Sequence, residues 1–391
     1  MKKKIQLLIL ALYSTISYAQ WTPVNTGLTN LQVYSFGTSG TNIFAGTSSS
    51  GVFLSTNDGS SWTPINNGLP SGMVVWAFAI DGSRIFIATY GGVYLSTNNG
   101  SNWVPVNSGL TNYYVYDVII SGTTVFAATF GGIFRSTNYG NSWTAVNTGL
   151  TDTDVRSLGI CGTNVFAGTY SGGIFITSNN GNNWTAVNNG LTISWITSFA
   201  TSGSMIFAQT YGEGIFSSNN NGNNWTPVDS GLTSLVGLDL IANGPNVYAG
   251  TYGGVFVTSN NGGNWSTDNT GLTNTQDVAV VINGTNIFVG TDGGGIFKRP
   301  VSELIGINEL QDNTSITVSP NPFNTVSIIT FPIEQNNITI KIIDVLGKEV
   351  KTISFTGKQL RIEKQEMKNG IYFVQIIDAK ENVMNKKIII Q

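Results

Sequence analysis

Short apolar runs alternate with glycine- and asparagine-rich turns along most of the chain. One stretch reads NIFAGT at residues 42–47, and another reads GVFLST at residues 51–56. Runs this short, rich in Val, Ile, Phe and Thr and bounded by turn residues, are typical of β-strands. The pattern predicts an all-β protein made of many short strands.

These runs belong to a unit that recurs with a fixed period. Its marker is a tryptophan followed by a segment such as WTPVNTGL, and successive markers are 40 or 41 residues apart: Trp21, Trp62, Trp103, Trp143, Trp184, Trp225 and Trp265. Each period holds four strand-like segments. Four short strands in a period of about 40 residues are typical of one blade of a β-propeller.

The number of segments predicts how many blades there are and how the ring closes. Six periods contain all four segments, whereas the last contains three, VAVVING, NIFVGTD and GGIFKRP. The segment at residues 21–25 is the missing outer strand. We therefore expect a seven-bladed β-propeller closed by the N-terminal strand, which leaves no open sheet edge.

The turn before each tryptophan carries a second repeated motif. It reads STNDGSSW at residues 55–62 and recurs in six copies. This motif resembles the Asp-box (BNR) repeat, Ser-x-Asp-x-Gly-x-x-Trp, of sialidases, some Asp-box glucanases, sortilin-type receptors and photosystem II assembly-factor propellers. Asparagine replaces the aspartate in every copy: Asn57, Asn98, Asn138, Asn179, Asn220 and Asn260. The resemblance implies a structural turn and not an active site.

The sequence at both ends predicts export. Lys2, Lys3 and Lys4 precede the apolar run 7–12 and the small-residue site Ser17-Tyr18-Ala19. This pattern is typical of a signal peptide at residues 1–19, and it is shorter than the roughly 20 apolar residues of a spanning helix. We expect a propeller at 20–300, a linker at 301–313, a C-terminal domain at 314–391 and no transmembrane segment.

The C-terminal region differs from the repeats in composition. Its strand-like runs are ITVSP, VSIITF, ITIKIID, VKTISF, IYFVQII and KKIIIQ, which predict a small Ig-like β-sandwich. The segments SPNPF at 319–323, IID at 342–344 with LGK at 346–348, NGIYFV at 369–374 and KKI at 386–388 resemble the C-terminal sorting domain of the type IX secretion system. The resemblance implies passage through the periplasm and an interaction with the type IX machinery. It also implies an extracellular or cell-surface location, whereas an ordinary Ig-like module is the alternative.

Composition narrows the chemistry. The 391 residues contain no histidine and one cysteine, with 18 basic and 21 acidic residues. The absence of histidine excludes imidazole general bases and histidine zinc sites. The near-neutral charge argues against nucleic acid as a partner. We expect no cofactor and no metal.

Two acids break the repeat in the predicted inner strands. Asp117 and Asp239 occupy a position that is Ser or Ala in other blades, such as Ser35 and Ala77. A facing pair of carboxylates would suit a glycoside hydrolase if they lay roughly 5 to 9.5 Å apart. The alternative is two hydrated acids without a catalytic role. Arg84, Arg135 and Arg156 fall at different strand positions, so we predict surface roles for them and no arginine triad.

Aromatic residues gather in loops that we expect on one face of the propeller. These candidate ligand-binding residues are Tyr90, Phe130, Tyr170, Tyr211, Tyr252, Trp195, Tyr113 and Tyr114. Flat rings beside polar groups suit stacking on sugar rings, although the same rings would also seal the blades. Two functions follow. One is a noncatalytic propeller that binds an extracellular glycan, peptide or surface polymer, and the other is an Asp-box-type glycoside hydrolase or lyase.

Overall fold

The computed structural model describes residues 20–304, apart from 193, 268, 277 and 278, and residues 316–391, apart from 345–347, 366 and 378–382. The predicted signal peptide and most of the predicted linker lie outside the described residues. The chain divides into two units, residues 1–304 and 305–391. The short helix α1 (Val301–Leu304) begins where the linker was predicted and belongs to the first unit.

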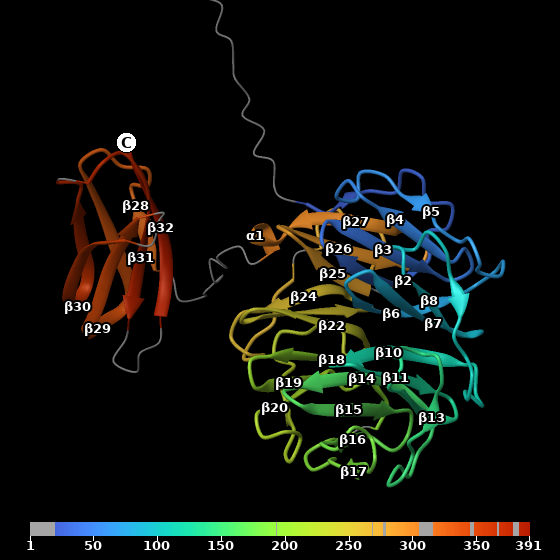
Figure 1. Cartoon of the computed structure of the whole chain (residues 1–391). Helices are drawn as coiled ribbons and strands as arrows, with labels where there is room; N and C mark the ends of the chain where they lie inside the picture. Colours follow the sequence, from blue (N-terminus) through green and yellow to red (C-terminus); the bar gives the residue numbers. More distant parts are fainter. Residues whose placement is uncertain are drawn as a thin grey trace, which may run out of the picture. The chain divides into compact units, whose positions relative to one another are not determined.

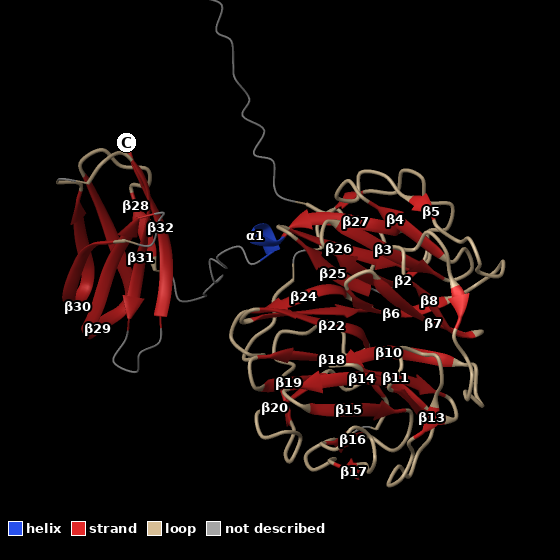
Figure 2. Ribbon diagram, in the orientation of Figure 1, coloured by secondary structure: helices blue, strands red, loops and turns tan. Residues whose placement is uncertain are grey.

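The described part of the first unit is almost entirely short antiparallel strands (Figure 2). Its four-stranded sheets include β2 (Val33–Ser39), β3 (Asn42–Thr47), β4 (Val52–Ser55) with β5 (Thr63–Pro64), and β6 (Val75–Asp81), β7 (Arg84–Thr89), β8 (Gly92–Ser96) with β9 (Val104–Pro105). Three more follow: β10 (Val115–Ser121), β11 (Thr124–Thr129), β12 (Gly132–Ser136) with β13 (Thr144–Ala145); β14 (Val155–Cys161), β15 (Asn164–Thr169), β16 (Ile174–Thr177) with β17 (Thr185–Ala186); and β18 (Ile196–Ser202), β19 (Met205–Thr210), β20 (Ile215–Ser218) with β21 (Thr226–Pro227).

The last two sheets of this unit differ slightly. One has three strands, β22 (Gly237–Asn243), β23 (Asn246–Thr251) and β24 (Gly254–Thr258), with a single bridge from Val257 to Ser266 in place of a fourth. The other contains β25 (Ala279–Asn283), β26 (Asn286–Thr291), β27 (Gly295–Pro300) and β1 (Thr22–Pro23). The fold is therefore all-β and propeller-like.

Neighbouring sheets pack face to face, and the hydrophobic core lies between them. One cluster joins Phe44 and Val52 of one sheet to Val75, Ile87 and Trp103 of the next. The first strand of each sheet contacts the first strand of the following sheet, and β25 in turn contacts β2. Figure 1 shows the late strands β25–β27 lying beside the early strands β2–β4.

Each repeated turn is stabilised by its own side chains. The Ser55 hydroxyl donates to Asn57 Oδ1 at 3.0 Å and accepts the Gly59 amide at 2.9 Å, while Asn57 Oδ1 accepts the Ser61 amide at 2.9 Å. Asp58 and Gly59 have φ values of 57° and 78°, which asparagine, aspartate and glycine tolerate best. Only an acceptor oxygen is needed at position 57, so asparagine replaces aspartate without loss of these bonds.

The tryptophan that follows each turn joins two sheets. Trp62 lies in the sheet of β2–β5, and its Nε1–H donates to the Val24 carbonyl, beside β1, at 2.8 Å. Its backbone carbonyl lies 2.1 Å from where a Cβ at Gly27 would stand. Gly27 also has a φ of 89°, so any other residue there would be strained and would clash.

The segment at residues 20–28 makes the same contacts with the last sheet. Thr22 pairs with Lys298, and Pro23 pairs with Phe297. Asn25 Oδ1 accepts the Ile296 amide at 2.6 Å, just as Asn66 Oδ1 accepts the Val52 amide in the first sheet. β1 therefore holds the place that the strand after each tryptophan holds elsewhere.

The second unit is a five-stranded all-β unit with one core. It contains β28 (Thr317–Ser319), β29 (Val326–Asp344), β30 (Glu349–Glu363), β31 (Gly370–Ile377) and β32 (Val383–Ile390). The runs VSIITF and ITIKIID were expected as two strands but form the single strand β29. The register between β29 and β30 shifts at Thr330, Gln335 and Ile338, so irregular pairing absorbs the residues that suggested a turn.

Removal of the first tryptophan should destabilise the propeller unit strongly. Trp21 is 1% exposed, so we expect Trp21→Ala to lower the free energy of unfolding by about 3–5 kcal/mol, the usual range for a buried aromatic side chain. Urea unfolding followed by tryptophan fluorescence measures this. The control Tyr113→Ala, at an exposed position, should change stability by less than about 0.5 kcal/mol. Equal effects of the two substitutions would contradict the role of Trp21.

Candidate functional site

The first strands of the sheets line a cavity of about 530 Å³. Every one of them contributes, from Phe36 of β2 to Ala279 of β25, and Trp195 adds its ring from the loop before β18. A cavity of this size falls in the range of small-molecule binding sites.

A β-bulge near the start of six of these strands turns one extra side chain toward the cavity. In β2, for example, the register with β3 shifts between Val33 and Ser35. An extra residue in one strand re-aims its side chain. The residues at the six bulges are Tyr34, Trp76, Tyr116, Arg156, Thr197 and Leu238, and all of them line the cavity.

The first half of an aromatic array extends from these bulges to the loops outside them. Tyr34 stacks on Trp76 with ring centroids 5.0 Å apart and an interplanar angle of 9°. Trp76 contacts Tyr90 at 5.4 Å, and Tyr90 contacts Tyr114 at 5.3 Å and Tyr116 at 6.4 Å.

The second half continues over the following sheets. Trp195 lies between Tyr170, at 4.8 Å, and Tyr211, at 4.0 Å and nearly parallel. Tyr211 meets Tyr252 edge-on at 6.2 Å. We call the whole set the aromatic arc: Tyr34, Trp76, Tyr90, Tyr114, Tyr116, Tyr170, Trp195, Tyr211 and Tyr252.

Arg156 connects the two halves of the arc. Its guanidinium lies 4.1 Å from the Tyr116 ring centroid and 5.3 Å from that of Tyr170. The prediction of a surface role for Arg156 is wrong, because the bulge turns this side chain into the cavity wall. The side chains of Arg84, in β7, and Arg135, in β12, instead reach repeated turns, where Arg84 stacks on Tyr139 and Arg135 bonds to Asn180 and Asn182.

The loop aromatics expected from the sequence are accessible. Six of them are between 36% and 54% exposed: Tyr90, Tyr113, Tyr114, Phe130, Tyr170 and Tyr252. Within the described residues Tyr113 and Phe130 make no ring contact, whereas the others join the arc. Sequence reasoning missed Tyr34, Trp76 and Tyr116, since alternation along a regular strand does not reveal a bulge.

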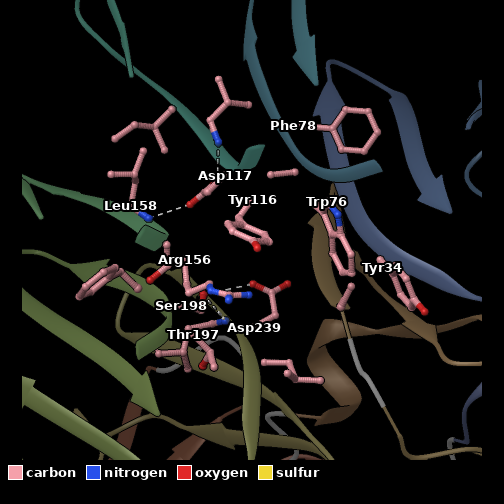
Figure 3. Close-up of a pocket in the computed structure, with 18 of the residues that line it drawn as sticks. Tyr34, Trp76, Phe78, Tyr116, Asp117, Arg156, Leu158, Thr197, Ser198 and Asp239 are labelled. Atoms are coloured by element: carbon pink, nitrogen blue, oxygen red, sulfur yellow. Dashed lines mark hydrogen bonds between the residues drawn. The ribbon is translucent and has the colours of Figure 1, made fainter. Parts of the chain in front are cut away.

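Asp117 faces the cavity and also joins two sheets (Figure 3). Its Oδ1 accepts the Val118 amide at 2.8 Å, and its Oδ2 accepts the Leu158 amide of the next sheet, also at 2.8 Å. The pKa of this carboxyl is raised to about 7, mainly by desolvation and to a smaller extent by the charge of Asp239, while the two hydrogen bonds oppose the rise.

Asp239 is held in the same way. Its Oδ2 accepts the Val280 amide of the following sheet at 2.9 Å, and the Ser198 hydroxyl lies 3.4 Å from Oδ1. Desolvation raises the pKa of Asp239 to about 6.

The matching residues of other sheets also bond to a neighbouring strand. Ser35 donates to the Val75 carbonyl at 2.9 Å, and Ser157 donates to the Ile196 carbonyl at 3.1 Å. The two acids therefore have a structural function at a position that already joins sheets. They also bring two titratable carboxyls to one cavity.

The described residues contain no group of three or more His, Cys, Asp or Glu residues placed to hold a metal ion. None of their helices has the length and apolarity that crossing a membrane requires.

Two protein families match the chain. A model of the DUF6242 beta propeller domain matches residues 23–150 and 165–280. A model of the secretion system C-terminal sorting domain matches residues 317–391. The resemblance of the C-terminal region to a sorting domain is confirmed by this match.

Solved structures share the fold at low identity. PorZ, an essential bacterial surface component of the type IX secretion system of Porphyromonas gingivalis, matches with a TM-score of 0.59 and 14% identity over 94% of this chain and 60% of PorZ. YCF48 bound to D1 peptide matches with 0.58 and 16% over 73% of this chain and 96% of YCF48. The GH74 enzyme of Niastella koreensis matches with 0.55 and 18% over 68% of this chain and 43% of the enzyme. These identities show the fold alone.

One curated relative is an enzyme. An endo-acting ulvan lyase of Formosa agariphila is 33% identical over 82 residues, which cover 20% of this chain and 15% of the lyase. The chain thus spans a small part of that relative, and the matched length is too short to include the propeller unit.

Replacement of Asp117 by the serine found in other sheets should change the pH dependence of stability. The folded pKa of about 7 lies above the unfolded value near 4, so this carboxyl contributes stability below about pH 4 that is lost as the pH rises through 7. We expect the parent to lose about 1–3 kcal/mol more than Asp117→Ser between roughly pH 5 and pH 8. Urea unfolding at both pH values measures the difference. Parallel curves for the two proteins would refute the raised pKa.

Proposed function

Since the chain belongs to the DUF6242 beta-propeller family and ends in a secretion sorting domain, we propose that it is an exported propeller that binds an extracellular ligand without catalysis. The ligand classes are a glycan, a peptide or a surface polymer. The observation that carries the proposal is the aromatic arc, which offers accessible rings beside a cavity. Solvent-exposed rings on one face are typical of binding surfaces.

The sorting domain indicates export by the type IX secretion system and a secreted or cell-surface protein. We propose the corresponding processing: removal of residues 1–19 as a signal peptide, transit of the periplasm, and recognition of residues 314–391 by the type IX machinery. In this proposal the propeller spans residues 20–300, and a linker at 301–313 joins it to the domain that the machinery recognises.

We also propose that the first unit is a seven-bladed ring closed by the N-terminal strand. Support comes from the pairing of β1 with β27 and from the contact between β25 and β2. The turns that resemble Asp-boxes are structural in this proposal. Their hydrogen bonds are internal, and they repeat too uniformly to select a ligand.

A second candidate is a glycoside hydrolase or lyase that uses Asp117 and Asp239. The raised pKa values of about 7 and 6 in one cavity favour it, because a general acid must stay protonated near neutral pH. The backbone amides bonded to both carboxyls favour a structural role instead. Turnover of a glycan that is lost in Asp117→Asn or Asp239→Asn would support the enzyme.

Loss of two rings from the arc should weaken binding without unfolding the protein. For the best ligand from glycan and peptide arrays, we expect Tyr170→Ala with Tyr211→Ala to reduce the binding free energy by about 1–3 kcal/mol, the range for stacking on aromatic rings. Isothermal titration calorimetry measures the affinity, and thermal unfolding tests the fold. The control Tyr139→Ala removes a ring at a repeated turn and should bind like the parent. Unchanged affinity in the double variant would remove the arc from the site.

Deletion of residues 314–391 should stop export but leave the propeller folded. We expect the truncated chain to accumulate in the periplasm, because the sorting domain is the part that the secretion machinery recognises. Fractionation with immunoblotting measures its location, and limited proteolysis tests its fold. Secretion of the truncated chain at the level of the full chain would contradict this role.

A further inference from the structure

The charges of the propeller unit are distributed unevenly. Arg156 is the only basic residue among those that line the cavity, while two acids, Asp117 and Asp239, lie in its wall. Most other basic side chains of this unit lie at the repeated turns, where Lys298 pairs with Asp58, for example, and Arg135 bonds to backbone and amide oxygens.

The single cation of the cavity is already paired. Arg156 forms an ion pair with Asp154, with Nε 2.7 Å from Oδ1, and its Nη2 donates to Oδ2 at 2.7 Å. Within the described residues neither Asp117 nor Asp239 forms an ion pair. When both are ionised, the cavity therefore carries excess negative charge.

The walls beside these acids are aromatic. Tyr34, Trp76 and Tyr116 reach the cavity from their bulges, and Figure 3 shows Trp76 and Tyr116 near Asp117 and Asp239. The face of an aromatic ring is electron-rich and attracts cations, most strongly when water is excluded. The aromatic faces and the carboxylates therefore both favour a positively charged ligand.

We infer that the cavity binds the basic side chain of an extracellular peptide, with its cationic end at Asp117 and Asp239 and its methylene stem against the aromatic walls. This inference rests on the proposed function and names the ligand class of the same site. A lysine or arginine side chain has an apolar stem and a charged end, which match the bulge residue and the acid that follows it along the strand. The bulge residues Tyr116 and Leu238 precede Asp117 and Asp239 by one position, so a stem packed on these side chains brings its charged end to the carboxyls. An amine attached directly to a sugar ring has no such stem.

Protonation of the two acids predicts that ligand affinity depends on pH. Asp117 titrates near pH 7 and Asp239 near pH 6, with Arg156, Asp154 and Tyr116 as the other titratable groups around them. A bound cation favours the ionised carboxylates. Affinity should therefore rise with pH from about 5 to 8 and fall when the acids are protonated.

The test uses the full chain and a matched pair of capped peptides, Gly-Gly-Lys-Gly-Gly and the same sequence with Nε-acetyl-lysine. Isothermal titration calorimetry at about pH 8 should show binding of the lysine peptide at least about tenfold tighter than that of its neutral counterpart. The preference should shrink at about pH 5. In Asp117→Ser with Asp239→Ser it should disappear, and serine already occupies this position in other sheets.

Several outcomes would overturn the inference. They are equal binding of both peptides, no binding of the lysine peptide, and a preference that survives in the double serine variant. Tighter binding of glucosamine oligomers than of the lysine peptide would assign the cavity to amino sugars instead. If the lysine peptide does not bind but a neutral glycan does, and Tyr170→Ala with Tyr211→Ala weakens binding of that glycan, the proposed function stands although this inference fails. If no array ligand binds, both fail together.

Discussion

The hydrogen bond from the indole of the tryptophan after each repeated turn to the sheet before it is the contact on which the propeller unit depends. It fixes the outer edge of one sheet against the outer edge of its neighbour, as Trp62 does with Val24. The Ser-Asn-Gly turn places the tryptophan, and a glycine such as Gly27 leaves room for its carbonyl. Since these parts interlock, a change in any one of them misplaces the strand that follows.

Because the outer edges of the sheets are held by repeated contacts, the residues that face the cavity from the inner strands can differ from sheet to sheet. Each inner strand has to supply backbone pairing and one small or hydrogen-bonding side chain, but its bulge residue faces open space. Aromatic, basic and apolar residues all occur at the bulges. The uniform part of the repeat therefore forms the scaffold, and the variable part forms the cavity.

The repeat made much of the fold predictable. The spacing of tryptophans identified the four-strand unit, and the three-segment last period pointed to the role of residues 21–25, which pair with β27. The loop positions of Tyr90, Tyr170 and Tyr252 could be read directly, because a glycine pair marks each loop. Trp76 and Arg156 could not, since a bulge changes the side of the sheet that a residue faces without any signal in hydrophobic alternation. The single strand β29 was missed because its turn-like residues are absorbed by register shifts.

The way that Asp117 and the serines join neighbouring sheets bears on how such a cavity diversifies. Asp117, Ser35 and Ser157 each bond to a backbone amide or carbonyl of the next strand and not to a side chain there, whereas Ser198 also reaches the Asp239 carboxyl. Backbone groups are present whatever the neighbouring residue is. A substitution at such a position in one sheet therefore needs no compensating change in the next, so the chemistry of the cavity can be altered one residue at a time.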